Sequence, residues 1–161
     1  MRKFLISTGT NIRKIVDFFY PPFSKYFTIE FFRYGVTGAA NLMFDWILYF
    51  CTFHFILEKQ MLHLGFVTLS SHIAALALSF PISFITGFLL QKYVTFTSSA
   101  LRGKTQIVRY GLVVIFNLSL NYFGLKLLVD IAGLFPTPSK MGITILAVII
   151  SYLSQKKFTF K

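Results

Sequence analysis

A long apolar run opens at Phe32-Arg33-Tyr34-Gly35, and a second one opens at Val108-Arg109-Tyr110-Gly111. Each half of the chain then closes on a basic and aromatic hexapeptide, QKYVTF at 91–96 and QKKFTF at 155–160. The chain therefore contains two similar units, at about 31–96 and 107–160. Because polar residues recur at matching depths in both units, the pattern predicts one membrane-facing site assembled from two halves, as in a small carrier.

The composition indicates an integral membrane protein. Of the 161 residues, 55% are hydrophobic and only 13% are charged, whereas a soluble domain averages roughly 25% charged residues. So little charge cannot cover a globule of this size, so apolar side chains must face lipid. The net charge of +11 comes from basic residues at the ends of the apolar runs. This placement favours contact with membrane lipids over binding of nucleic acid.

No motif for catalysis, metal binding or a cofactor occurs in the sequence. A single cysteine, Cys51, excludes an intramolecular disulfide, and the three histidines lack the spacing of metal ligands. A Gly-rich phosphate loop and a nucleophile elbow are also missing. We therefore expect a protein that is not an enzyme and that needs neither a metal nor a cofactor.

Four stretches are long and apolar enough to cross a bilayer as helices, which takes about 20 residues. They are 31–55, 65–90, 107–131 and 139–154. Basic residues concentrate before the first stretch, between the second and third, and after the fourth, so these regions belong in the cytoplasm. The sequence thus predicts an all-α membrane protein of four transmembrane helices, arranged as two parallel two-helix repeats with cytoplasmic N- and C-termini.

The first thirty residues differ from the rest of the chain. Apolar and charged residues alternate at 12–19, and Pro21-Pro22 follows them. This pattern favours a short amphipathic segment at the cytoplasmic membrane interface, and a docking helix for a partner is the alternative. We expect this N-terminal segment, 1–30, to precede a four-helix transmembrane domain at 31–161.

Alignment of the two halves matches Asn41 and Asp45 with Asn117 and Asn121. Each pair is spaced by four residues and so shares one helix face. Asp45 lies roughly 18 Å along the helix from Arg33, near mid-bilayer, where a carboxylate costs about 2.5–3.5 kcal/mol. We predict that the four residues line a path for a sugar head group, with Asp45 accepting hydrogen bonds or a proton. Hydrogen bonding between helices is the alternative for the asparagines.

Cationic side chains occur at the cytoplasmic ends of all four stretches: Arg33, Lys92, Arg109 and Lys156. Snorkelling accounts for such positions, but four converging cations also suit a phosphate or pyrophosphate, for which Arg supplies a bidentate fork. The adjacent Gln91 and Gln155 can donate further hydrogen bonds. We predict that these six residues bind phosphate.

Small residues recur every four positions in the second stretch, at Ser71, Ala75, Ser79, Ser83 and Gly87. Such a stripe favours close helix packing, and a groove for a slender chain is the alternative. Pro81 interrupts this stretch and has no counterpart in the second half.

The chain resembles the GtrA-like family over about 31–160. Each half opens on Arg-Tyr-Gly, carries an Asn further along the helix and closes on Lys-x-x-Thr-Phe. The closing element departs from the family's frequent Trp-x-Phe, since Tyr93-Val94-Thr95-Phe96 and Lys157-Phe158-Thr159-Phe160 stand there.

The resemblance implies a multi-pass protein of the bacterial cytoplasmic membrane. Its function would be to flip a polyprenyl-phosphate-linked sugar for cell-surface polysaccharide or teichoic acid glycosylation, beside a membrane glycosyltransferase. The alternative is a non-transporting subunit that anchors or recruits the glycosyltransferase. A small multidrug exporter fits less well, because the cationic helix ends would repel cationic drugs. Four helices enclose little volume, so we also expect a homo-oligomer.

Overall fold

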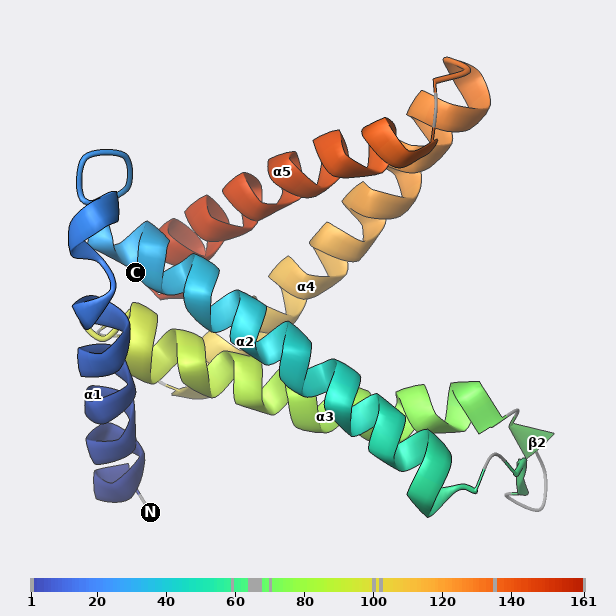
Figure 1. The fold of residues 1–161 in the computed structure, drawn as a ribbon, viewed down its shortest axis with the longest axis horizontal. Helices are drawn as coiled ribbons and strands as arrows, with labels where there is room; N and C mark the ends of the chain where they lie inside the picture. Colours follow the sequence, from blue (N-terminus) through green and yellow to red (C-terminus); the bar gives the residue numbers. More distant parts are fainter. Residues whose placement is uncertain are drawn as a thin grey trace. The chain divides into compact units, whose positions relative to one another are not determined.

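The computed structural model describes residues 2–58, 60–63, 68–69, 71–99, 101, 103–134 and 136–160. Two units make up the chain, Met1–Thr97 and Ser98–Lys161. Each unit contains a pair of long helices that are joined at one end (Figure 1). The described residues are almost entirely helical, in agreement with the predicted all-α class.

The first unit contains α1 (Arg2–Phe18), the 3₁₀ turn η1 (Pro21–Phe23), α2 (Ile29–Cys51), η2 (Thr52–Ile56), β1 (Leu62–His63), β2 (Thr68–Leu69), α3 (Ser71–Leu90) and η3 (Gln91–Thr95). Helix α2 begins after Thr28, whose side chain accepts a hydrogen bond from the Phe31 N–H, as an N-cap residue does. Its partner α3 continues through Pro81. The two short strands pair antiparallel between α2 and α3, with Leu62 opposite Leu69.

The second unit contains α4 (Gly103–Leu125), η4 (Lys126–Ile131), α5 (Pro136–Ser154) and η5 (Gln155–Thr159). The turns η2, η3, η4 and η5 are π-helical, a conformation that is rare in proteins and frequent at functional sites. In both units a long helix is followed by a π-helical turn, a second long helix and another π-helical turn. Both closing hexapeptides therefore begin with the same backbone conformation.

Three helical segments among the described residues are long and apolar enough to cross a membrane: Ile29–Ile56, Ala74–Thr95 and Gly103–Leu128. They correspond to the first three predicted stretches, although the predicted start of the second, at 65, lies outside the described residues. The fourth stretch coincides with most of α5, which is not among the three. Four crossings, the parallel repeat and the cytoplasmic termini therefore stay predictions.

The small-residue stripe of α3 lies inside the first unit. Ala75, Ser79 and Ser83 are buried. Ser83 lies close to α2, since its carbonyl accepts a hydrogen bond from the Asn41 side chain. Helices α2 and α3 run side by side along this seam (Figure 1). The stripe therefore serves close packing of two helices.

Helix α1 packs against the end of the α2–α3 pair, at η3 (Figure 1). Its buried face includes Gly9 and Val16. A Cβ placed on Gly9 would lie 2.7 Å from the Tyr93 Cβ and 2.8 Å from the Tyr93 carbonyl oxygen. The absence of a side chain at Gly9 thus lets α1 approach the backbone of η3. The helix is longer than the short segment predicted from 12–19, since it begins at Arg2.

Candidate functional site

A cluster of polar side chains links α2 to η3 in the first unit. The Thr37 hydroxyl donates to the Arg33 carbonyl at 2.7 Å and lies 3.2 Å from the Thr95 hydroxyl. Gln91 donates from Nε2 to the Thr37 Oγ1 at 3.3 Å. All three side chains of Thr37, Gln91 and Thr95 are buried. The predicted phosphate ligand Gln91 therefore already uses its donor group inside the protein, and its buried Oε1 has no partner among the described residues.

Asn41 lies one helical turn beyond Thr37 and connects α2 to α3. Its Nδ2 donates to the Ser83 carbonyl at 3.1 Å, while its buried Oδ1 has no hydrogen-bond partner in the described part of the chain. Asn41 thus forms the interhelical bond of the packing alternative. An acceptor oxygen is left over for a ligand hydroxyl, a water or another donor.

Asp45 follows Asn41 by one further turn on α2 and is half-buried. It makes no hydrogen bond and no ion pair with any residue that the structure describes. The segment Ile29–Ile56 that contains it is a candidate membrane span. An uncompensated carboxylate in a span is costly and is therefore a marker of a functional position.

Arg33 forms an ion pair that the sequence analysis did not predict. Its Nε and Nη2 each lie 2.7 Å from an oxygen of the Asp17 carboxylate on α1, in the bidentate geometry of strong Arg–carboxylate pairs. The side chains of Arg33 and Asp17 are 14% and 31% exposed, so water only partly screens the pair. The predicted phosphate ligand Arg33 is thus occupied by an internal anion that links α1 to α2.

Loss of this ion pair should destabilise the first unit. We expect Asp17→Asn to lower the free energy of unfolding by about 1–2 kcal/mol, between exposed and buried ion pairs. Arg33→Gln should cost less, because Asp17 is the more exposed partner and can regain water. Thermal unfolding of the detergent-solubilised protein measures both effects, and Lys14→Gln, an exposed cation on α1, is the control. Equal unfolding temperatures for Asp17→Asn and Lys14→Gln would contradict the assignment.

The cations of the hexapeptides contact aromatic rings. The Lys92 Nζ lies 5.6 Å from the centroid of the Phe88 ring and 5.6 Å from that of Tyr93. In the second unit the Lys156 Nζ lies 3.5 Å from the Tyr152 hydroxyl and 5.8 Å from the centroid of that ring. These distances are those of cation–π contacts. Each lysine thus contacts an aromatic ring that lies within four residues of it in the sequence.

Arg109 corresponds to Arg33 but has a different environment. Its Nη1 donates to the Phe158 carbonyl at 2.7 Å, and the guanidinium carbon lies 4.8 Å from the centroid of the Phe158 ring. Within the described residues, Arg109 forms no ion pair with a carboxylate. The two arginines that the sequence places in equivalent positions are therefore not equivalent in the structure.

The asparagines of the second unit bond along their own helix. Asn117 donates to the Val113 carbonyl at 2.8 Å, and Asn121 donates to the Asn117 carbonyl at 2.9 Å. Both side chains are half-buried. Asn117 thus does not reproduce the bond that Asn41 makes to a neighbouring helix.

The hexapeptide clusters also differ between the units. Val113 occupies the position that corresponds to Thr37, as Thr159 corresponds to Thr95. The Thr159 hydroxyl is fully buried and has no hydrogen-bond partner in the part that the structure describes. Gln155 donates to the Ser151 hydroxyl at 3.4 Å, on its own helix. A valine therefore replaces the hydroxyl that joins the cluster in the first unit.

Exchange of these residues tests the comparison. Thr37→Val removes the acceptor of Gln91, so we expect it to destabilise the protein by about 1–3 kcal/mol, the cost of unsatisfied buried groups. Val113→Thr adds a hydroxyl to α4, which packs against η5, and should be neutral or stabilising by about 1 kcal/mol. Thermal unfolding of both variants measures the difference. A loss of the same size in the two variants would contradict this account.

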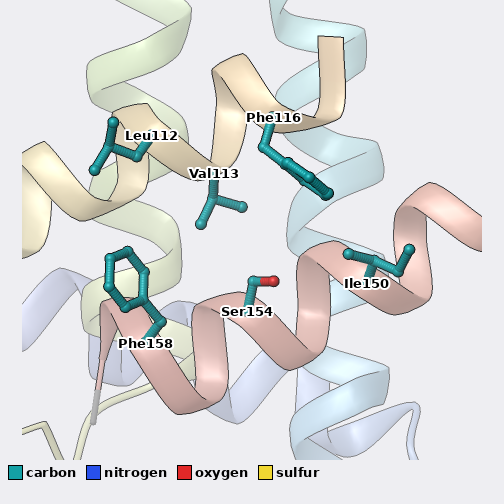
Figure 2. Close-up of a pocket in the computed structure, with 6 residues that line it drawn as sticks. All are labelled: Leu112, Val113, Phe116, Ile150, Ser154 and Phe158. Carbon is teal, nitrogen blue, oxygen red and sulfur yellow. The ribbon is translucent and has the colours of Figure 1, made fainter. Parts of the chain in front are cut away.

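A groove lies on the second unit next to Arg109. It is lined by Leu112, Val113 and Phe116 of α4, Ile150 and Ser154 of α5, and Phe158 of η5, and its volume is ≈ 390 Å³. Figure 2 shows these side chains converging from the two helices. The Ser154 hydroxyl is the single polar side chain among the six lining residues. This groove could not be predicted from the sequence, because its residues are spread over two apolar helices with no polar pattern.

The predicted site residues fall into two groups. Arg33, Asn41, Asp45, Gln91 and Lys92 belong to the first unit, and Arg109, Asn117, Asn121, Gln155 and Lys156 belong to the second. Their assembly into one phosphate site and one sugar path stays a prediction. Asp17 and Thr37 were not predicted as partners of the site residues. The available signals were that Asp17 is the single acidic residue in 1–28 and that Thr37 follows Arg33 by one helical turn. In the described part of the chain, no three His, Cys, Asp or Glu side chains form a group suited to a metal ion.

The long apolar helices and their internal polar residues define a helical membrane protein. Residues 33–160 match the family model of the GtrA/DPMS transmembrane domain. The match covers most of the chain, so the protein belongs to this family, and the predicted GtrA-like membership is confirmed. The family groups membrane proteins of glycosylation pathways. Neither the comparison with curated proteins nor that with solved structures found a match.

Proposed function

We propose that this protein translocates a polyprenyl-phosphate-linked sugar across the bacterial cytoplasmic membrane for glycosylation of a surface polysaccharide or teichoic acid. It acts as a carrier and not as an enzyme. One observation carries the proposal: the family match extends over 33–160 and thus includes all but the first four residues of the candidate spans, and every predicted site residue.

The chemistry of a lipid-linked sugar explains why these residue types are needed. Sugar hydroxyls lose their hydrogen bonds to water in a bilayer, and each unsatisfied polar group costs several kcal/mol there. The Asn41 Oδ1, which has no partner among the described residues, and the Asp45 carboxylate, one turn further along α2, are acceptors for such hydroxyls. Asp45 is the stronger acceptor, because hydrogen bonds to charged groups are the stronger ones.

The phosphate of the substrate needs a cation at the membrane boundary. Arg109 and Lys156 lie far apart in the sequence of the second unit, but Arg109 donates to the Phe158 carbonyl of η5 and Lys156 belongs to η5. An arginine binds phosphate oxygens in a bidentate manner, and a lysine adds a point charge. The hydrocarbon tail stays in the lipid or in an apolar groove while the head group crosses.

Transport in proteoliposomes tests the proposal. The purified protein is reconstituted with polyprenyl phosphates that carry different sugars, and the fraction of sugar accessible to an external glycosidase or lectin is followed with time. We expect faster appearance of at least one sugar than in protein-free liposomes. Well-folded protein that accelerates none of them would contradict the carrier. Capture of a membrane glycosyltransferase by that inactive protein would instead support the recruiting subunit.

A further inference from the structure

The two equivalent arginines differ in how much of each guanidinium is available. Arg33 donates through Nε and Nη2 to both oxygens of Asp17. Arg109 donates one hydrogen bond, from Nη1 to the Phe158 carbonyl, and its other N–H groups have no acceptor among the described residues. An arginine carries five N–H donors. Arg109 is thus the arginine of this pair that keeps a positive charge and donors available for an external anion.

Arg109 also lies directly beside the apolar groove of the second unit. The Phe158 ring, 4.8 Å from the guanidinium carbon, is itself a wall of the groove. Leu112 and Val113 follow Arg109 by three and four positions on α4, so they lie on the same helix face. A cation at one end and an apolar groove beyond it match an amphiphile with an anionic head and a hydrocarbon chain.

The size of the groove bears on the number of chains. Its volume of ≈ 390 Å³ is near the lower limit of small-molecule sites, which span about 300–1,000 Å³. A groove of this size, lined by side chains of two helices (Figure 2), suits one chain better than the two of an ordinary phospholipid. The Ser154 hydroxyl offers one polar contact along it.

We propose that the groove between α4 and α5 binds a membrane lipid that carries a phosphate on a single hydrocarbon chain. The guanidinium of Arg109 holds the phosphate, and the chain lies against Leu112, Phe116 and Ile150. The ion pair with Asp17 makes Arg33 a structural residue, so of the two equivalent arginines only Arg109 binds the phosphate. Only the identity of the natural ligand, the lipid-linked substrate, rests on the proposed function.

Equilibrium binding to the detergent-solubilised full chain tests the site, with farnesyl phosphate as the probe. We expect saturable binding of farnesyl phosphate, and binding at least about tenfold weaker for farnesol and for inorganic phosphate, because each lacks one half of the contact. Phosphatidylglycerol that binds as tightly as farnesyl phosphate would overturn the single-chain assignment. Inorganic phosphate that binds equally would overturn the role of the groove.

Variants locate the binding. Arg109→Gln should weaken farnesyl phosphate at least about tenfold through loss of charge-assisted hydrogen bonds. Ser154→Leu should weaken it by filling the groove without a change of charge. Lys104→Gln is the control, since it removes an exposed cation from the same helix. Unchanged binding in both Arg109→Gln and Ser154→Leu would overturn the proposal.

Binding and transport then separate the two proposals. If the protein binds farnesyl phosphate through Arg109 but transports no lipid-linked sugar, the lipid-binding groove is supported and the carrier function is contradicted. If Arg109→Gln leaves transport unchanged, the carrier function is supported and the role of Arg109 in binding the phosphate is contradicted.

Discussion

Asp45→Asn should slow transport of the lipid-linked sugar at least about tenfold, because a hydrogen bond to a charged group contributes about 1.5–3 kcal/mol. The carboxylate is half-buried in a candidate span and has no partner in the described part of the chain. Asparagine keeps the shape of the side chain but removes the negative charge and one acceptor oxygen. The initial rate in proteoliposomes is the measurement.

Asp45→Asn should not lower the stability of the protein, although it slows transport. An unpaired carboxylate in a span costs about 2.5–3.5 kcal/mol, so Asp45→Asn should unfold at the same temperature as wild type or higher. Gly38→Ala on the same helix is the control, since a Cβ there meets nothing within 4 Å. A lower unfolding temperature with an unchanged transport rate would show that Asp45 is structural.

Gly9→Leu should detach α1 from η3. Even the Cβ of a side chain at Gly9 would lie 2.7 Å from the Tyr93 Cβ and 2.8 Å from the Tyr93 carbonyl oxygen, which belongs to the backbone of η3. Overpacking of this kind costs about 1–3 kcal/mol, and the larger leucine cannot be placed without movement of the helix. We expect faster hydrogen exchange of the amides in 2–18 and a lower unfolding temperature.

The control for Gly9 is Gly35→Ala, compared with Gly9→Ala. Both glycines are in helices, and an alanine Cβ at Gly35 meets nothing within 4 Å. Alanine favours a helix over glycine by about 1 kcal/mol, so Gly35→Ala should be neutral or stabilising. Gly9→Ala should be destabilising despite the same gain in propensity. Protection of 2–18 that is the same in both alanine variants would show that α1 does not depend on this close contact.

The outer face of α1 leaves a role for the membrane surface. Phe4 and Phe18 are 71% and 78% exposed, and Lys3 and Lys14 lie exposed on the same helix. Exposed aromatic side chains beside cations are typical of a helix in the interface of a bilayer. The predicted interfacial segment is therefore compatible with the docking of its opposite face on η3.

Length and hydropathy were sufficient to predict the first three helices, because twenty apolar residues have few alternatives to a helix in lipid. The ends of the third segment illustrate this: 107–131 was expected and α4 with η4 spans Gly103–Ile131. The family followed from short motifs that recur in order, and the match over 33–160 confirmed it. The roles of single residues were less accessible.

Arg33 shows why. Its equivalence with Arg109 in sequence predicted the same task for both, but an acidic residue sixteen positions earlier, Asp17, occupies Arg33. The ion pair depends on how closely α1 approaches α2, and this distance cannot be predicted from the periodicity of the sequence. The same holds for Asn117, whose amide bonds to its own helix where Asn41 reaches α3. Duplication conserves the order of elements more readily than the partners of individual side chains.

The most direct test of the central claim is the rate at which a polyprenyl-phosphate-linked sugar crosses the bilayer in proteoliposomes with wild-type protein, Arg109→Gln, Lys104→Gln or no protein. We expect acceleration by wild type and by Lys104→Gln, and a rate with Arg109→Gln at least about tenfold below wild type. If the lipid-linked sugar crosses the bilayer no faster with folded wild-type protein than in protein-free liposomes, the proposed carrier function is contradicted.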